Sequence, residues 1–528
     1  MIVHPAVALR VCVSSLVRVA GGIESCRRPL LESYFIASTR RARMLHWLSV
    51  VATTPTASGL QPPALRARPA LGSAWAAMVL LSVLLAASSS ASGEPSVRAG
   101  RPNIVLIMAD DMGYECVGAN GGQTYRTPHL DRLAASGMRF EHCYSQPLCT
   151  PSRVQIMTGR YNSRNYIRFG VLDPQATTFG NILRDAGYAT CVVGKWQLKG
   201  GFEGPHRFGF DEYCLWQLTR RPNRYANPGL EINGRQADFN SGEYGPDIVS
   251  DYACDFIERS AKGDSPFFLY YPMILPHWPF EPTPVSADWD PTFRRGDTTE
   301  KSYKMREHKY FIEMVNYADR IVGKIVAKLE SVGVRDNTLV IFTCDNGTYA
   351  GLISQFQGRP WKGGKGHMMD NGTRVPLIVS WPGTVGPGQV NRDLIDFTDM
   401  LPTLADVTGA TVPRRLGVTG RSFLPQLLGK RGNPREFVYC WYFRNGKPIP
   451  GGKEHKAGES ARTHRYKLYR TGEFYDVSAD FYEQSPLQAD ALTDEQRAVR
   501  ERLRQVIGEH TRPGFYSRQR KRGRKLPQ

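Results

Sequence analysis

The sequence predicts an α/β fold, in which helices sandwich a large, mostly parallel central sheet and a smaller C-terminal α+β subdomain carries an antiparallel sheet. Two observations lead to this prediction. From Arg101 to about residue 430, short apolar runs that end in polar or glycine-bearing turns alternate with a helical pattern, which is typical of buried parallel strands. After residue 430 the chain becomes aromatic and hairpin-like.

The individual elements follow from the same patterns. We expect buried strands at the continuous apolar runs 103–108, 188–193, 267–271, 339–343 and 377–381. Between two of these runs, an apolar stripe at helical spacing extends from Phe311 to Leu329 and predicts a long amphipathic helix. Hairpin strands are expected at 437–443, 466–469 and 474–477. Thr493-x-x-Gln496 forms a capping box that opens a final helix.

The beginning of the chain has the order of a secretory signal. Residues 74–87 form one apolar run, which follows Arg66 and Arg68 and precedes small residues. A bilayer span needs about 20 residues, so this shorter run favours a cleaved signal over a stable membrane span. A buried helix in a folded N-terminal domain is the alternative, and translation could start downstream, for instance at Met44. We expect an exported protein, periplasmic or extracellular.

We therefore divide the chain into four parts. Residues 1–93 are a leader with a signal peptide, residues 100–430 a catalytic α/β domain, residues 431–511 the C-terminal subdomain and residues 512–528 a basic tail. Of the net charge of +19, residues 1–98 and 512–528 each carry +7, so the body is only mildly basic. Nucleic-acid binding by the folded part is therefore not expected. The 10 cysteines contain no C-x-x-C pair that would indicate a zinc site, and most should be buried thiols.

Polar residues follow the predicted strands at the edge where α/β proteins bind ligands. Asp110 and Asp111 follow the first run, and Asp345 and Asn346 follow 339–343. Together they offer three carboxylates and an amide oxygen, which suit Ca²⁺ or Mg²⁺. A turn or a helix cap would also explain either acidic pair taken alone.

Cationic and protonatable groups belong to the same edge. Lys195 follows the run 188–193, His277 follows 267–271, and Lys365 stands in a glycine turn ahead of 377–381. Facing a metal, these groups would form a pocket for a multiply charged oxyanion, because each can donate charge-assisted hydrogen bonds. The glycine-lysine pairs lack the spacing of a nucleotide-binding phosphate loop.

The segment Cys149-Thr150-Pro151-Ser152-Arg153 predicts the start of a helix. Proline is preorganised for the first helical turn, so Cys149 should lie at the helix entrance, where free amide protons favour an anion. Arg153 should lie within about one turn of it. The pattern alone is not specific, but it occurs together with the metal-type and anion-type groups.

These motifs resemble those of the type I sulfatases, arylsulfatase-like members of the alkaline-phosphatase-type superfamily. C-T-P-S-R is similar to the signature in which the cysteine becomes formylglycine, and Gly187 to Leu198 match the second signature, G-Y-x-[ST]-x-x-x-G-K-W-x-L. The resemblance runs from about residue 102 to 383 and returns at 473–477, which is similar to a strand of the family's C-terminal subdomain.

The resemblance implies a role for each residue. The divalent cation, usually Ca²⁺ with Mg²⁺ as the alternative, would be held by Asp110, Asp111, Asp345, Asn346 and the modified Cys149. Arg153 would orient the formylglycine. Lys195, His277 and Lys365 would bind the sulfate oxygens, and His277 would donate a proton to the departing alcohol. In the implied mechanism, the hydrated aldehyde attacks sulfur, the alcohol leaves, and the second hydroxyl expels sulfate. A formylglycine-generating maturation enzyme is an implied partner.

Two positions depart from the family. Gln197 stands where most members have histidine, and although glutamine can still hydrogen-bond to sulfate, it cannot shuttle a proton near neutral pH. We keep Gln197 as a substrate-pocket residue. The segment 370–372, Asp-Asn-Gly, also differs from the family's usual text, and we expect a turn there and not a second metal site.

The sequence thus predicts an exported sulfatase that acts on a sulfated small molecule or saccharide. The alternatives are a phosphodiester or phosphonate monoester hydrolase on the same scaffold and a catalytically weakened sulfate-binding homologue. The aromatic segments 213–216 and 276–280 could be loops that pack on sugar rings, or could belong to the core.

Overall fold

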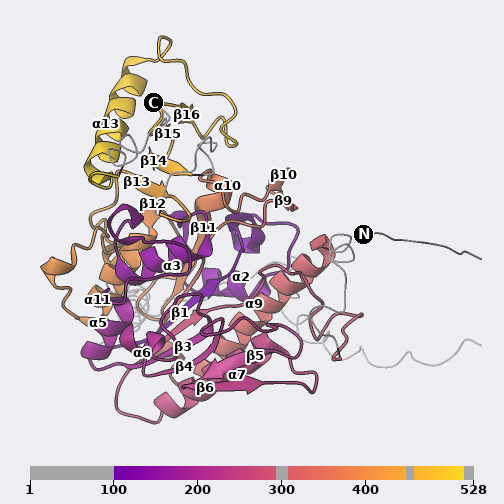
Figure 1. Cartoon of the computed structure of the whole chain (residues 1–528). Helices are drawn as coiled ribbons and strands as arrows, with labels where there is room; N and C mark the ends of the chain where they lie inside the picture. The colour runs from indigo at the N-terminus through magenta and orange to yellow at the C-terminus, as the bar shows by residue number, and fades with distance from the viewer. Residues whose placement is uncertain (1–99, 293–306, 447–456, 516–528) are drawn as a thin grey trace, which may run out of the picture. The chain divides into compact units, whose positions relative to one another are not determined.

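The computed structural model describes residues 100–292, 307–446 and 457–515, and these residues contain the predicted central sheet (Figure 1). Its strand order is β12-β2-β11-β8-β1-β7-β3-β4-β5-β6. In chain order these strands are β1 (Asn103–Ala109), β2 (Met138–Tyr144), β3 (Ala189–Lys195), β4 (Glu212–Trp216), β5 (Gly229–Ile232), β6 (Arg235–Asp238), β7 (Phe267–Pro272), β8 (Thr338–Cys344), β11 (Arg374–Ser380) and β12 (Gln389–Asp396).

The centre of this sheet is parallel. β8, β1, β7, β3 and β4 pair in parallel, while β11 runs antiparallel to both β8 and β2. Every residue of β1, β7 and β8 is buried. The five predicted runs correspond to β1, β3, β7, β8 and β11, so the predicted fold class is confirmed.

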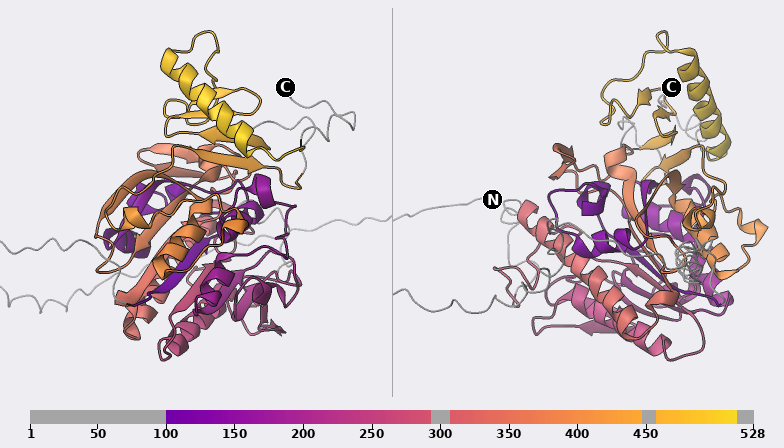
Figure 2. Two further views of the ribbon diagram at one scale, coloured as in Figure 1. Left: turned by 90° about the vertical axis from the view of Figure 1, so that its left-hand side faces the viewer. Right: turned by 180° about the vertical axis from the view of Figure 1, so that it is seen from behind.

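Two groups of helices cover the sheet (Figures 1 and 2). One group contains α2 (Pro128–Ala135), α7 (Gly245–Ser260) and α9 (Glu307–Ser331), and the other contains α3 (Cys149–Thr158), α5 (Phe179–Asp185) and α11 (Met400–Thr408). α9 is the predicted amphipathic helix, and Phe311, Met314 and Val315 are fully buried in its apolar stripe. Shorter helices are α4 (Asn162–Asn165), α6 (Gly204–Arg207), α10 (Asp370–Thr373) and α12 (Leu424–Leu427).

The C-terminal part forms the second, antiparallel sheet that the hairpin-like pattern predicted. Its strands are β13 (Val438–Tyr442), β14 (Gly458–Arg462), β15 (Tyr466–Tyr469) and β16 (Phe474–Asp476). Helix α13 (Asp494–His510) packs on it and begins at the predicted capping box, in which the Thr493 side chain accepts from the Gln496 amide. A separate hairpin is made by β9 (Ile353–Phe356) and β10 (Arg359–Lys362).

The aromatic residues of 213–216 belong to the core and do not form a sugar-binding loop. They lie in β4, where Tyr213 and Trp216 are fully buried, as is Phe280. Trp278 is only partly buried. A strand was not predicted here because the run is short and begins at the charged Glu212.

The leader and most of the basic tail lie outside the described residues, as does the apolar run 74–87. Within the described ranges, no helix has the length and apolar character required to cross a membrane. The domain boundaries at residues 430 and 511 remain predictions.

Candidate active site

Four oxygen-bearing residues meet where β1 and β8 end. Ala109 of β1 pairs with Cys344 of β8, so the residues that follow leave the sheet side by side. The backbone N–H of Asp111 donates to Oδ1 of Asp345 at 3.2 Å, and Nδ2 of Asn346 donates to Oδ1 of Asp111 at 2.8 Å. The side chains predicted to share one sheet edge, Asp110, Asp111, Asp345 and Asn346, are all fully buried.

Asp111 adopts a backbone conformation that is unusual for its residue type. Its φ of 72° lies in the left-handed region, which costs a residue other than glycine of the order of 1 kcal/mol. Such strain persists where the surroundings fix the conformation, and it is concentrated at functional sites. Here the carboxylate of Asp111 accepts hydrogen bonds from Asn346 and Lys365.

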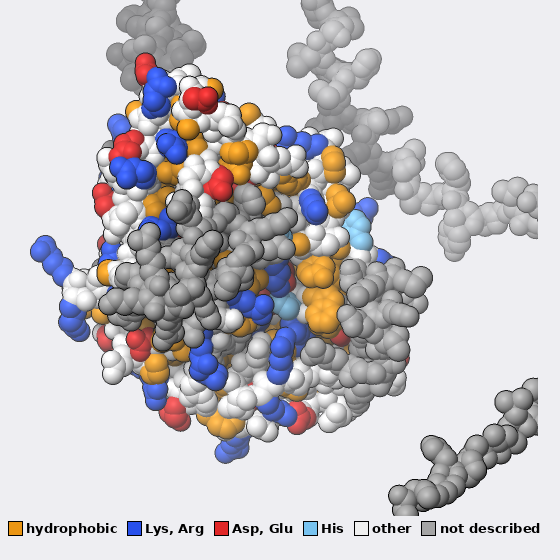
Figure 3. Space-filling view, turned by 45° about the horizontal axis from the view of Figure 1, so that its top comes forward, with side chains coloured by type: hydrophobic (Ala, Val, Ile, Leu, Met, Phe, Trp, Pro, Cys, Tyr) orange, Lys and Arg blue, Asp and Glu red, His pale blue; other side chains and the backbone are white. Residues whose placement is uncertain are grey.

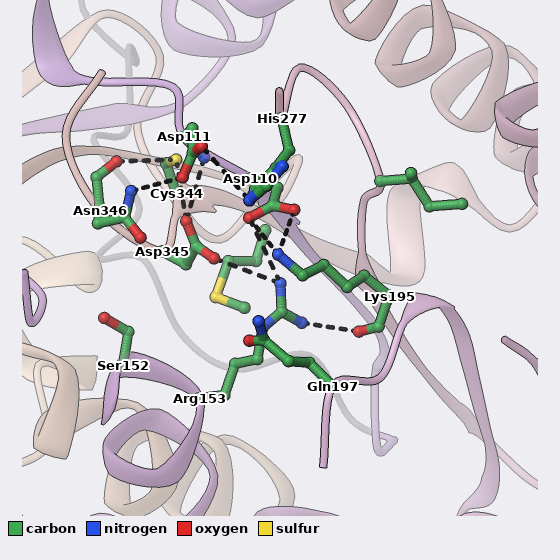
Figure 4. A network of polar contacts seen from close by, with 12 residues as sticks. Asp110, Asp111, Ser152, Arg153, Lys195, Gln197, His277, Cys344, Asp345 and Asn346 are labelled. Atoms are coloured by element: carbon green, nitrogen blue, oxygen red, sulfur yellow. Dashed lines mark hydrogen bonds and ion pairs between the residues drawn. The ribbon is translucent and has the colours of Figure 1, made fainter. Parts of the chain in front are cut away.

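The two predicted lysines contact these carboxylates. Nζ of Lys195 is 2.8 Å and 2.6 Å from the two oxygens of Asp110 (Figure 4), and Nζ of Lys365 donates to Oδ2 of Asp111. Lys365 precedes its strand, yet it reaches the same edge as Lys195, because β11 runs antiparallel to β8. Burial raises the pKa of a carboxyl group, but the charges of Lys195 and Arg153 hold the pKa of Asp110 well below its ordinary value.

Arg153 connects helix α3 to Lys195 at the end of β3 and to Asp345 after β8. It is 1% exposed, its Nη1 donates to the carbonyl of Lys195 at 2.8 Å, and its Nη2 donates to Oδ2 of Asp345 at 3.3 Å. Burial and the charge on Asp110 raise the pKa of Asp345 well above its ordinary value. Asp110 and Asp345 are thus two buried carboxyl groups that repel each other when both are charged. This arrangement is typical of cation sites, because a bound cation would offset the repulsion.

Cys149 is the first residue of α3, as the sequence predicts. It is buried, and its electrostatic neighbours are Lys195, Asp345, Asp110 and Lys365. Burial raises the pKa of its thiol. Because the thiolate is the nucleophilic form of cysteine, the unmodified side chain is poorly activated at this position.

His277 completes the cluster from the loop after β7. Its Nε2 lies 3.1 Å from Nζ of Lys365 and 3.7 Å from Oδ2 of Asp111. On the opposite side of the ring, Nδ1 lies 2.5 Å from the carbonyl oxygen of Trp278 and 3.0 Å from Nη1 of Arg224. Burial and the charges of Lys365 and Lys195 hold the pKa of His277 well below its ordinary value.

Sequence reasoning missed Arg224. Its guanidinium group is buried and stacks on Trp216, with 4.0 Å between Cζ and the ring centroid. Neither residue belongs to a motif, and the contact with His277 joins positions 53 residues apart, so no local pattern could have indicated it.

Gln197 lies at the edge of this cluster, as Figure 4 shows. Its backbone φ is 59°, and its Oε1 accepts a hydrogen bond from the hydroxyl of Thr150 at 3.2 Å. Thr150 in turn accepts from the backbone N–H of Gly170 at 3.1 Å. The oxygen end of the amide is thus engaged within the protein, and Gln197 joins the start of α3 to the loop after β3.

The C-terminal sheet contacts the segment that follows Lys365, and sequence reasoning did not predict this contact. Arg462 of β14 forms a buried ion pair with Asp370, and Nζ of Lys467 in β15 donates to the carbonyl of Met368 at 2.5 Å. At 370–372, where the sequence indicated a turn, the structure has the short helix α10.

The residues present fit a divalent cation. Ligand atoms of Asp110, Asp111 and His277 lie within 4.8 Å of one another, a group that contains two of the predicted metal ligands but not Asp345. Oδ1 of Asn346 is buried and has no hydrogen-bond partner among the described residues. An unpartnered amide oxygen beside buried carboxylates matches the oxygen ligands that Ca²⁺ and Mg²⁺ prefer.

Comparisons with known proteins show which families and structures this chain is similar to. The family model described as Sulfatase matches residues 102–410, and the model described as N-sulphoglucosamine sulphohydrolase, C-terminal, matches residues 363–510. N-acetylgalactosamine-6-sulfatase of Canis lupus familiaris is 33% identical over 396 residues, which cover 68% of this chain and 72% of the relative. Arylsulfatase A of Homo sapiens is 32% identical over 374 residues, covering 64% and 70%.

Solved structures share the fold. The crystal structure of Ps i-CgsB in complex with k-i-k-neocarrahexaose has a TM-score of 0.64 and 25% identity, and the match covers 79% of this chain and 95% of that one. The PsFucS1 sulfatase from Pseudoalteromonas sp. has a TM-score of 0.62 and 22% identity, covering 84% and 94%.

Proposed function

The chain belongs to the sulfatase family of sulfuric ester hydrolases, and from this premise we propose that it is exported and hydrolyses a sulfate ester on a sulfated carbohydrate. Two relatives support a carbohydrate substrate. One is an N-acetylgalactosamine-6-sulfatase, and Ps i-CgsB was crystallised with k-i-k-neocarrahexaose. The apolar run 74–87 supports export.

One observation carries the proposal. Cys149, at the N-terminus of α3, shares its electrostatic environment with two lysines and with buried carboxylates that follow β1 and β8. Amide protons at a helix N-terminus and two ammonium groups favour a dianion such as sulfate. The carboxylates would repel that dianion unless a cation lay between them, so the two halves of the site require each other.

The divalent cation of this proposal would be held by Asp110, Asp111, Asp345 and Asn346, together with the modified Cys149. When bound, Ca²⁺ or Mg²⁺ would offset the carboxylate charge and lower the pKa of a hydroxyl group beside it. The unpartnered Oδ1 of Asn346 supports this assignment.

Cys149 is, in this proposal, converted to formylglycine by a maturation enzyme. Formylglycine supplies a hydroxyl nucleophile through its hydrate, which the buried thiol with its raised pKa cannot do. Arg153, one turn along α3, orients this side chain and is itself fixed by the Lys195 carbonyl and by Asp345.

Lys195 and Lys365 bind the sulfate oxygens. An ammonium group has three hydrogen-bond donors, so each lysine can keep its hydrogen bonds to an aspartate carboxylate and still donate to sulfate. His277 is the proton donor to the departing alcohol in this proposal, through Nε2, the nitrogen that lies beside Lys365 and Asp111. Donation needs the protonated ring, which burial and the two lysines disfavour and which a bound sulfate dianion beside Nε2 would favour. The Trp278 carbonyl and Arg224 fix the ring from its other side.

Gln197 motivates a second candidate function, a protein that binds sulfate but turns sulfate esters over slowly. Its amide cannot accept and return a proton, and Thr150 already donates to its oxygen. A fully modified sample that binds sulfate without hydrolysing sulfate esters would establish this second function.

The test is hydrolysis of an aryl sulfate beside the matched aryl phosphonate ester, with Ca²⁺ present. We expect turnover of the sulfate, its loss in Cys149→Ala, and its retention in the control Cys254→Ala, which removes a buried thiol from α7. Turnover of the phosphonate alone would overturn the proposed substrate class of this site, and unchanged activity in Cys149→Ala would exclude the proposed nucleophile.

A further inference from the structure

Two chain segments lie directly against the N-terminal end of α3. The segment 166–171 contacts it through the hydrogen bond from the backbone N–H of Gly170 to Oγ1 of Thr150. The segment 197–199 contacts it through Gln197, whose Oε1 accepts from the same Thr150 hydroxyl. The two segments also bond to each other, because the backbone N–H of Lys199 donates to the Gly170 carbonyl at 2.9 Å.

Two further segments join these. The segment 442–446 is held by the hydroxyl of Tyr166, which donates to the Arg444 carbonyl at 2.7 Å. The segment 217–224 follows β4, and the backbone N–H of Gln197 donates to its first carbonyl at 3.2 Å. Its last residue, Arg224, contacts His277 of the candidate active site. Four segments from different parts of the chain are therefore joined by hydrogen bonds, and two of them contact the start of α3 directly.

These segments contain basic residues and no acidic residue. The basic residues are Arg168, Lys199, Arg220, Arg221, Arg224 and Arg444. Arg220 pairs with Asp238, and Arg224 is buried against His277. The other four, which we call the basic rim (Arg168, Lys199, Arg221 and Arg444), are exposed. Figure 3 shows Lys and Arg side chains gathered around a histidine on the face drawn there.

The basic rim lacks acidic partners in the part of the chain that the structure describes. None of its four side chains forms an ion pair with a carboxylate of the described residues. Two of them are instead supported by aromatic rings, because Arg444 lies 4.9 Å from the centroid of Phe169 and Arg221 lies 5.9 Å from that of Trp216. Like charges without counter-charges destabilise a fold slightly. Because the segments that carry them are joined to Thr150, the neighbour of Cys149, and to His277, these unpaired charges favour an anionic ligand that extends from the anion pocket.

We propose that the basic rim forms a subsite for a second anionic group of the substrate, a sulfate or a carboxylate on the sugar next to the one that is hydrolysed. The proposal rests on the proposed function and deepens it. The protein then selects carbohydrate chains with several anionic groups over singly sulfated sugars. Arginine and lysine recognise both oxyanions through charge-assisted hydrogen bonds, so the rim binds sulfate and carboxylate alike.

The test compares four substrates that share one sulfated terminal sugar: the monosaccharide, and oligosaccharides of equal length whose remaining sugars are neutral, carry carboxylates or carry sulfates. We expect kcat/KM to be higher for the charged oligosaccharides than for the neutral one, and the two charged arms show which oxyanion the rim prefers. Equal values for all three oligosaccharides would overturn the proposal.

Variants locate the effect. Each of Arg221→Gln and Arg444→Gln should lower the ratio of kcat/KM between charged and neutral oligosaccharides by about two- to fivefold, which corresponds to one exposed ion pair. Added salt should reduce the same ratio, and less so in the double variant. The control Arg415→Gln makes the same charge change at an exposed arginine near Val418, which faces Gly159 at the other end of α3, and should keep the wild-type ratio.

The outcomes separate this inference from the proposed function. Failure to hydrolyse the aryl sulfate or any of the four sugars would overturn the proposed function. Hydrolysis with a ratio that Arg221→Gln and Arg444→Gln leave at the wild-type value, or change no more than Arg415→Gln does, would overturn the subsite alone.

Discussion

Replacement of Arg462 by methionine should destabilise the protein strongly, because it breaks the buried ion pair that joins the C-terminal sheet to the segment after Lys365. Arg462 and Asp370 are each 6% exposed at the side chain. Removing one partner of such a pair leaves an uncompensated buried charge, which costs about 3–5 kcal/mol. Tyr144 offers Asp370 one weak further hydrogen bond at 3.3 Å, and the charges of Lys467 and Arg374 also favour the Asp370 carboxylate, so we expect the lower end of this range.

The double variant Asp370→Asn, Arg462→Met tests this reasoning. It removes both charges, so it should recover a large part of the free energy of unfolding that Arg462→Met loses. The matched control is Arg465→Met, also in the C-terminal part, where the ion pair with Asp476 is largely exposed on the arginine side and should contribute about 0–1 kcal/mol.

The assay is equilibrium unfolding in urea, followed by aryl sulfate kinetics of each folded variant. Because Asp370 and Met368 lie on the segment that follows Lys365, Arg462→Met should also raise KM for the aryl sulfate. The claim that this pair is a buried, coupled unit would be refuted by either of two results. One is that Arg462→Met loses less free energy of unfolding than Arg465→Met, and the other is that the double variant is no more stable than Arg462→Met.

Three further predictions concern the site and its surroundings. Burial raises the pKa of Glu115 from 4.5 to about 7, so the free energy of unfolding should fall by about 3 kcal/mol as the pH rises from 4.5 past 7. Glu115→Gln should abolish that fall, which urea unfolding at several pH values measures. Asp345→Asn should weaken the stabilisation by added Ca²⁺, measured as the shift in Tm, and an unchanged shift would exclude Asp345 from the proposed metal site. Gln197→His should raise kcat in fully modified protein, and a kcat that stays the same would show that another base serves the second step.

The elements that place chemistry at the sheet edge could be predicted from the sequence. Continuous apolar runs reveal strands buried on both faces, and the residues just after β1 and β8 share an edge because the strands are parallel. Pro151, two residues after Cys149, indicated the start of α3. Strands with mixed composition, such as β4, could not be recognised because their burial is decided by neighbours distant in sequence.

The parts of the site that escaped prediction depend on long-range packing. Arg224 stacks on Trp216 and reaches His277. Arg462 of β14 pairs with Asp370 of α10, 92 residues earlier in the chain. No spacing rule connects such positions, because each contact exists only once the intervening chain has folded. Lys365 lies at the predicted edge, but the reason, the antiparallel direction of β11, is visible only in the structure.

The most direct test of the central claim is peptide mass spectrometry of the protein purified from its own source. We predict that the peptide containing Cys149 has the lower mass expected when the thiol is replaced by an aldehyde, while the peptide containing Cys254 keeps its thiol. A free thiol at Cys149 in protein that hydrolyses sulfate esters would contradict the proposed nucleophile.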